Sequence, residues 1–374
     1  MGRSNIYLEL LRFIVTAVLR SATFIFFLLF YQIFSDSPLF NDILFLVSIY
    51  IFICTSVLPN ITNYGVLNDA YLFKKVSFIN SSINYFIFTC FCLSFLYQPT
   101  FLACALGLAI KSVGREVVLL RQGNIIFYSL AMALRLIVPT LILFVLLILD
   151  EVNISIIYAV FFLAEIIRYG FLRLILADSD FPNTKMGIIE FTEKSIPILI
   201  TGLGLLALRG IAYYHWEESY VSIDATVRLI ELIVSISTLY FVQRFQFQLT
   251  TKLIDWAALG ASIGIVILCM AVIDIFGGSL PKLALIAQVD FSPYNILKYI
   301  ALSISMILTI YASKVLLILD KSSVSPILFF SSLYFCVLIA LIKFGAGVFS
   351  VFMVLTILNT FYAALVVLRF VKSY

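Results

Sequence analysis

Charge is scarce in this sequence. Only 12% of its 374 residues are Asp, Glu, Lys or Arg, against roughly 25% in soluble proteins. Hydrophobic residues make up 63%. Apolar runs of about 20 residues, which are long enough to cross a hydrocarbon core of about 30 Å, recur along the chain. A soluble globular fold is therefore excluded, and we expect an all-α, multi-pass integral membrane protein.

Residues that carry chemistry are also few. The chain has one histidine, His215, and no G-x-x-x-x-G-K-[ST] motif. A single histidine together with scattered carboxylates argues against a catalytic metal site or a Ser-His-Asp triad. Without the phosphate-binding motif we expect the chain to carry no ATPase of its own. The six cysteines form no C-x-x-C pair, so we assign them to helix packing. We therefore expect no enzyme activity, no catalytic residue, no metal and no cofactor, which leaves transport as the leading class.

About twelve apolar runs qualify as membrane spans. They cover residues 8–34, 43–64, 77–96, 99–120, 125–149, 154–176, 190–213, 222–246, 253–276, 293–318, 325–343 and 346–370. We expect the first run to be a span and not a cleavable signal peptide, because it is too long for the apolar region of a signal peptide.

The loops between the runs alternate in charge. Loops 35–42, 97–100, 150–153 and 213–221 contain no Lys or Arg, and Lys282 and Lys343 are the only basic residues near the other two loops on that side. The loops on the opposite side are basic. By the positive-inside rule the basic loops and both termini face the cytoplasm. Lys and Arg occur singly or in pairs beside the spans, so we expect contact with membrane lipids and no nucleic-acid partner.

A polar connection at about 177–189 divides the chain into two halves. We expect six spans in each half, with residues 1–180 in the N-terminal half and 186–374 in the C-terminal half. Six spans in each place the halves parallel in the membrane, and parallel repeats are an architecture of transporters.

The first half contains arginines at membrane depth. Arg20 lies eight residues beyond Arg12, or about 12 Å along a helix, and Arg135 lies in the middle of its run, four residues before Pro139. Charges at this depth are functional candidates unless they reach a helix end. No carboxylate is expected at similar depth in the first five spans, so we expect these arginines to line a cavity without partners. The alternative is a carboxylate that neutralises Arg20 and only joins two helices.

The second half has a charged group in the run 222–246. Asp224, Arg228 and Glu231 are spaced so that both acids can pair with Arg228 on one helix face. This group is either a self-neutralised cluster or an ion-coupling site, in which Glu231 and Asp224 are the candidates. Arg209, near the outer end of the preceding run, either extends to the interface or binds a ligand.

Two other charged groups have structural explanations. Glu116 follows Lys111 and Arg115 at the end of its run, and we expect all three at the membrane interface. Glu165 and Arg168 form an i, i+3 pair that we expect near the cytoplasm.

The whole chain resembles the multidrug/oligosaccharidyl-lipid/polysaccharide (MOP) exporter superfamily, and within it the lipid-linked polysaccharide (O-antigen type) flippases. Three stretches carry the resemblance: "LPNITNYGVLNDAYLFKK", "YVSIDATVRLIELIVSISTLYF" and "IKFGAGVFSVFMVLTILNTFYAALVVLRFV". The first is similar to the family's Gly-containing turn after span 2, the second to its span 8 and the third to its final hairpin.

The resemblance implies a function. Such a flippase moves an undecaprenyl-diphosphate-linked oligosaccharide, an O-antigen or capsule repeat unit, across the bacterial inner membrane by alternating access. Cavity arginines hold the anionic headgroup, and by position these are Arg12, Arg20, Arg209 and Arg228; Arg135 is added from its depth alone. We expect a monomer, with other polysaccharide-assembly proteins as candidate partners.

Three alternatives remain. A polysaccharide polymerase or ligase of the same pathway has a similar composition, but usually carries a large external loop with paired arginines. A cation-coupled drug antiporter of the same superfamily prefers an acidic residue inside its first half. A structural membrane protein would need no transport at all.

Overall fold

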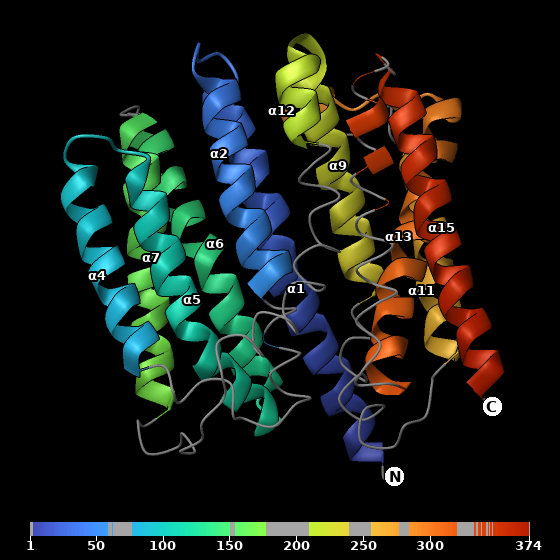
Figure 1. The fold of residues 1–374 in the computed structure, drawn as a ribbon, viewed down its shortest axis with the longest axis horizontal. Coiled ribbons are helices and arrows are strands. Elements are labelled where there is room, and N and C mark those ends of the chain that lie inside the picture. Colours follow the sequence, from blue (N-terminus) through green and yellow to red (C-terminus); the bar gives the residue numbers. More distant parts are fainter. Residues whose placement is uncertain are drawn as a thin grey trace. The chain divides into compact units, whose positions relative to one another are not determined.

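A computed structural model of the chain describes residues 3–58, 62, 77–149, 154–176, 209–238, 256–276, 284–319 and 347–373, with isolated residues between 333 and 345. All secondary structure in these segments is helical, and they contain no strand (Figure 1). The expected all-α fold is therefore confirmed for the described residues.

Close contacts between residues divide the chain into two compact units, Met1–Gly202 and Leu203–Tyr374. We call them unit 1 and unit 2. The expected boundary between the halves, at 180–186, and most of the run 190–213 lie outside the described residues. The two six-span halves therefore stay a prediction.

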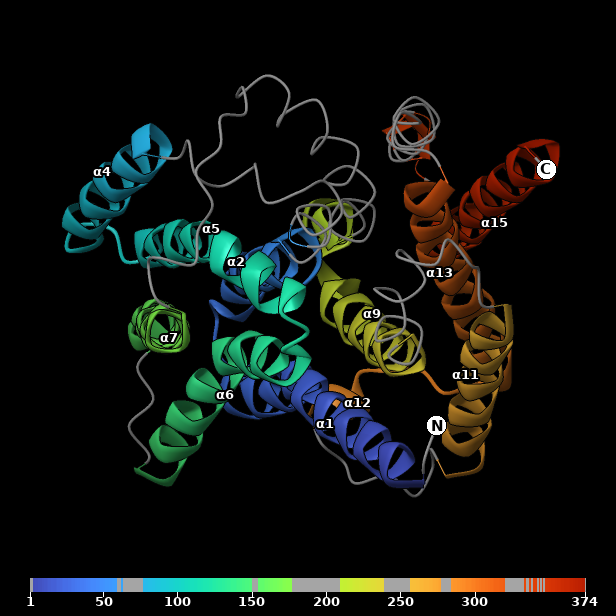
Figure 2. The same ribbon diagram turned by 90° about the horizontal axis from the view of Figure 1, so that it is seen from below.

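Unit 1 contains one π-helix and six described α-helices. They are α1 (Arg3–Phe34), α2 (Phe40–Phe52), the π-helix η1 (Ile53–Val57), α4 (Ser77–Ser94), α5 (Thr100–Arg121), α6 (Ile125–Leu149) and α7 (Ile154–Ile175). α5 packs against α4 and α7, and α6 packs against α1 and α7. Figure 2 shows α5, α6 and α7 side by side. These helices place the charged residues of unit 1 close together.

The turn between α5 and α6 has a local cause. Gly123 has a φ of 72°, a left-handed conformation that favours glycine at a helix end. The Asn124 N–H donates to the Leu119 carbonyl over 3.0 Å and closes the last turn of α5. α6 begins at Ile125. The two helices are therefore antiparallel neighbours, and side chains along both can meet.

Unit 2 is described by α9 (Glu217–Ser237), α11 (Trp256–Phe276), the short α12 (Ala284–Ala287), α13 (Pro293–Leu319) and α15 (Val348–Ser373). Residues 209–215 are also helical and precede α9. α13 packs against α9, α11 and α15.

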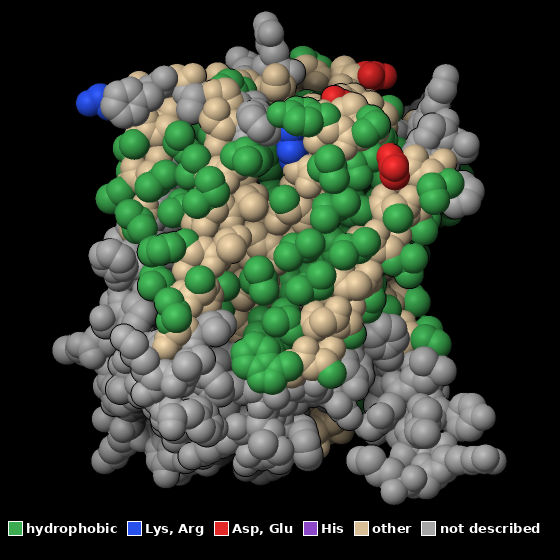
Figure 3. Space-filling view, turned by 90° about the vertical axis from the view of Figure 1, so that its right-hand side faces the viewer, with side chains coloured by type: hydrophobic (Ala, Val, Ile, Leu, Met, Phe, Trp, Pro, Cys, Tyr) green, Lys and Arg blue, Asp and Glu red, His purple; other side chains and the backbone are tan. Residues whose placement is uncertain are grey.

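Four described helical segments are long and apolar enough to cross a membrane: Ala17–Phe34, Ile126–Leu149, Trp256–Ile275 and Pro293–Ala312. α5, α7 and α9 carry more charge, but at 21 or 22 residues each they are also about 30 Å long. On the face in Figure 3, hydrophobic side chains cover a broad band, as a lipid-facing surface requires. The number of twelve spans and the orientation of the termini stay predictions.

Candidate functional site: two buried ion-pair clusters

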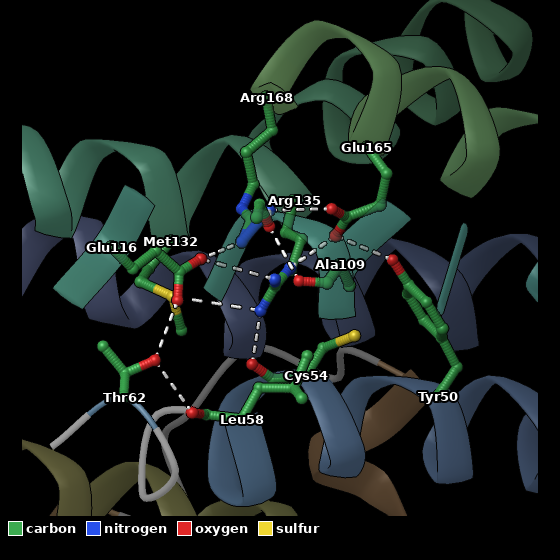
Figure 4. Close-up of polar contacts among 11 residues, drawn as sticks. Tyr50, Cys54, Leu58, Thr62, Ala109, Glu116, Met132, Arg135, Glu165 and Arg168 are labelled. Atoms are coloured by element: carbon green, nitrogen blue, oxygen red, sulfur yellow. Dashed lines mark hydrogen bonds and ion pairs between the residues drawn. The ribbon is translucent and has the colours of Figure 1, made fainter. Parts of the chain in front are cut away.

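Four charged side chains of unit 1 meet between three helices, and we call them cluster 1 (Figure 4). The members are Glu116 of α5, Arg135 of α6, and Glu165 and Arg168 of α7. None is more than 1% exposed. Two arginines and two carboxylates give cluster 1 a formal charge of zero, which is how buried charges are usually tolerated.

Each carboxylate of cluster 1 lies between both arginines. Arg168 donates to Glu116 through Nη2, and its Nη1 lies 2.9 Å from Glu165 Oε2. Arg135 donates to Glu165 Oε1 through Nε, and its Nη2 lies 3.7 Å from Glu116 Oε1. The cluster is therefore a closed set of four contacts, in which no carboxylate depends on a single arginine.

Neutral groups complete the coordination of the two carboxylates. The Tyr50 hydroxyl, from α2, donates to Glu165 Oε1 over 3.0 Å. Thr62 Oγ1 lies 3.1 Å from Glu116 Oε2 and 3.0 Å from the Leu58 carbonyl. Arg168 Nη1 also donates to Ser112 Oγ on α5. The cluster thus connects α5, α6 and α7 to the chain segment that contains α2 and η1.

Arg135 also contacts the backbone of the π-helix η1. In η1 the Leu58 N–H donates to the Ile53 carbonyl, five residues back, as a π-helix requires. The next donor in that pattern would be the N–H of residue 59, which is Pro59 and has none. The Cys54 carbonyl instead accepts a hydrogen bond from Arg135 Nη1. Arg135 therefore satisfies a backbone carbonyl that this helix pattern leaves open.

The structure corrects two sequence-based expectations for unit 1. Arg135 was expected to lack a partner, but it is paired with Glu165. Glu116 was expected at the membrane interface, but it is fully buried. Sequence reasoning missed Glu116 and Arg168 as parts of one cluster. The available signal was the i, i+4 spacing of Ser112 and Glu116, which puts both polar side chains on one face of α5.

Unit 2 contains a second group of four, which we call cluster 2: Arg209, Asp224, Arg228 and Glu231. The Nε of Arg209 lies 2.8 Å from Oδ1 of Asp224. Its Nη1 lies 3.0 Å from Oε1 of Glu231, and its Nη2 lies 2.7 Å from Oε2 of Glu231. Arg228 contacts Asp224 through Nε at 2.8 Å and Nη2 at 3.2 Å. Cluster 2 also has two arginines and two carboxylates, so it too is formally neutral.

Cluster 2 partly agrees with the spacing argument. Arg228 pairs with Asp224 four residues away, as that spacing allows. Glu231 pairs with Arg209, which precedes α9. Arg209 is 1% exposed and therefore buried among other side chains, whereas Glu231 is 26% exposed. The structure therefore brings together four of the seven residues predicted for the site, and a ligand-binding or ion-coupling role for them stays a prediction.

Arg12 and Arg20 both lie in α1, but their side chains lie outside the described residues. Among the described residues no group of three or more His, Cys, Asp or Glu side chains could hold a metal ion. Each cluster holds two positive and two negative side chains in contact.

No protein-family model and no curated protein sequence matches the chain. The chain is similar in fold to solved structures, of which two follow. One carries the description "Reverse polarity of binding pocket suggests different function of a MOP superfamily transporter" and comes from Pyrococcus furiosus; it has 11% identity, a TM-score of 0.57, and coverage of 96% of this chain and 94% of its own.

The second is described as the outward-facing conformation of a multidrug resistance MATE family transporter of the MOP superfamily. It has 11% identity, a TM-score of 0.58, and the same coverage of 96% and 94%. At this identity the likeness concerns the fold, and it extends over nearly the whole of both chains. The chain has the fold of the multi-pass MOP superfamily transporters.

Proposed function

We propose that the chain is an alternating-access transporter that flips a lipid-linked oligosaccharide with a diphosphate headgroup across the bacterial inner membrane. The observation that supports transport is the MOP fold over 96% of the chain. The substrate class rests on the sequence resemblance and on the arginines within the apolar helices. In such a transporter the lipid tail stays in the bilayer while the headgroup and sugars cross.

The buried pairs of the two units narrow the choice of headgroup-binding residues. Arg135 is neutralised within cluster 1, and Arg209 and Arg228 contact carboxylates within cluster 2. Arg12 and Arg20 of α1 are therefore the leading candidates, and a pair of guanidinium groups suits the two phosphates of a diphosphate. Arg209 or Arg228 would take part only if the ligand replaced a carboxylate.

Transport can be measured with the purified chain in proteoliposomes. A fluorescent prenyl-diphosphate oligosaccharide in both leaflets reports flipping, because a membrane-impermeant quencher then removes more than the outer-leaflet signal. We expect flipping by the wild type, none by Arg20→Ala, and partial flipping by Arg20→Lys, which keeps the charge but loses the planar donor fork. The exposed cation Lys343 gives a matched control, and Lys343→Ala should flip normally. Wild-type vesicles that never exceed the signal of empty vesicles would overturn the proposed substrate.

A second candidate is a cation-coupled drug antiporter of the same fold. The observation that favours it is the full burial of Glu116 and Glu165 in unit 1, because acids inside the first half are the feature expected of that branch. The same vesicles, loaded with a lipophilic fluorescent cation and given a pH gradient, separate the two candidates. Cation movement driven by the gradient, without lipid flipping, would establish the antiporter.

A further inference from the structure

The two clusters have the same formal charge but differ in how far their side chains are exposed. In cluster 1 every member is at most 1% exposed. In cluster 2, Arg209 and Asp224 are at most 1% exposed and Arg228 is 3% exposed, while the side chain of Glu231 is 26% exposed. Glu231 is therefore the member of cluster 2 that can turn away from its partner without moving a helix.

The contact that Glu231 makes has the geometry of ligand binding. Its two oxygens lie at 3.0 and 2.7 Å from the two terminal nitrogens of Arg209. This parallel pair of N–H···O contacts is the arrangement in which an arginine binds either a carboxylate or a phosphate. The carboxylate thus occupies a position that a phosphate group could fill with the same two contacts.

Arg209 does not depend on Glu231 for its position. Its Nε is held by Asp224 Oδ1 at 2.8 Å, and Asp224 is itself fixed by Arg228 at 2.8 Å. If Glu231 leaves, the Nη edge of Arg209 is opened while the guanidinium stays in place. Cluster 1 cannot exchange a carboxylate in this way, because each of its carboxylates is buried between two arginines.

We propose that Glu231 is a displaceable internal ligand of Arg209, and that the diphosphate of the lipid headgroup replaces it during transport. This inference rests on the proposed function and gives Arg209 a defined part in it. Without substrate, Glu231 supplies the second negative charge of cluster 2, because Asp224 alone would face both Arg209 and Arg228. With substrate, a phosphate takes the two Nη contacts and the Glu231 carboxylate turns to its exposed side. No bond is made or broken in this exchange.

The test measures binding of inorganic pyrophosphate to the full-length chain in detergent micelles by calorimetry at low ionic strength. Glu231→Gln removes the competing charge and keeps the side-chain size, so we expect pyrophosphate to bind about tenfold more tightly, a change of about 1.4 kcal/mol. The matched control is Asp274→Asn, which removes an exposed carboxylate of α11 in the same unit. It should bind pyrophosphate as the wild type does.

Two variants of Arg209 complete the set. Arg209→Gln should abolish the gain when combined with Glu231→Gln. Arg209→Lys keeps the buried charge but loses the fork, so it should fold and bind pyrophosphate more weakly than the wild type. Glu231→Gln with wild-type affinity, or a gain that persists without Arg209, would overturn the exchange.

A second ligand identifies the source of the phosphate. Farnesyl diphosphate carries the same headgroup on a short prenyl tail, and we expect it to bind more tightly than pyrophosphate in every variant that binds either. Equal affinities would overturn the assignment to a lipid headgroup. The flipping assay separates the two proposals. If the wild type flips the lipid but Glu231→Gln changes neither flipping nor pyrophosphate binding, the exchange is overturned and the proposed function stands. If the wild type does not flip the lipid, the proposed function is overturned.

Discussion

Each arginine of cluster 1 does more than balance one charge. Arg168 contacts Glu116, Glu165 and Ser112, and Arg135 contacts both carboxylates and a backbone carbonyl. An arginine can do this because its planar group offers five N–H donors in several directions. A lysine has one nitrogen and could not reach the same set of acceptors. This explains why the buried cations of both clusters are arginines.

Removal of Arg168 should destabilise the protein more than removal of an exposed arginine. Arg168→Met keeps an unbranched side chain but removes the guanidinium, which leaves Glu116 and Glu165 with one arginine between them. An uncompensated buried charge typically costs about 3 to 5 kcal/mol, so we expect a large fall in the melting temperature measured in detergent. The double variant Arg168→Met/Glu116→Gln restores neutrality and should recover much of the loss. A single variant as stable as the wild type would show that the cluster does not support the fold.

At the scale of elements, η1 and α6 depend on each other. Arg135 on α6 donates a hydrogen bond to the Cys54 carbonyl. The π pattern would pair this carbonyl with the N–H of residue 59, but that residue is a proline and has no N–H. A π-helix is uncommon and is frequently found at functional sites. The link from η1 through Arg135 to Glu165 means that a change of helical pattern in η1 would reach cluster 1 directly.

This dependence predicts coupling between Pro59 and Arg135. Pro59→Ala restores a backbone N–H that can donate to the Cys54 carbonyl. In the wild type that carbonyl already has a donor, so the gain should be small. In Arg135→Met, Pro59→Ala should stabilise the protein by about 1 kcal/mol more than it does in the wild type. Unfolding in mixed SDS micelles measures the four proteins of this cycle, and an identical effect of Pro59→Ala in both backgrounds would contradict the link.

The elements themselves were largely predictable. The run 125–149 is α6 to the residue. The run 99–120 differs from α5 by one residue at each end, and the run 154–176 differs from α7 by one residue at its end. Continuous apolar runs and the Gly-containing turn after α5 carry this information locally. The charge pairs between helices were not predictable, because spacing within one helix gives no position for a side chain of another. Glu165 could be placed beside Arg168, but its contacts with Arg135 and Tyr50 depend on packing of separate helices.

At the scale of the whole molecule, both units contain a neutral buried cluster. The formal net charge of +4 therefore resides outside the two clusters. A membrane chain orients itself by the Lys and Arg residues close to its span ends, and buried pairs within the bundle do not contribute to that signal. The predicted orientation therefore rests on the basic loops and not on the buried arginines of the two clusters.

The expected orientation places both termini in the cytoplasm and the loop 150–153 on the opposite side. A phosphatase that is active only outside the cytoplasm should be active when inserted after Asn153 and inactive when fused after Tyr374. A green fluorescent protein fused after Tyr374 should fluoresce, since it folds in the cytoplasm. A phosphatase that is active at both positions would mean an even number of spans between Asn153 and Tyr374 and would contradict the seven expected there. Addition of four lysines to the loop 150–153 should weaken or reverse this pattern, because the charge difference between the two sides is what sets it.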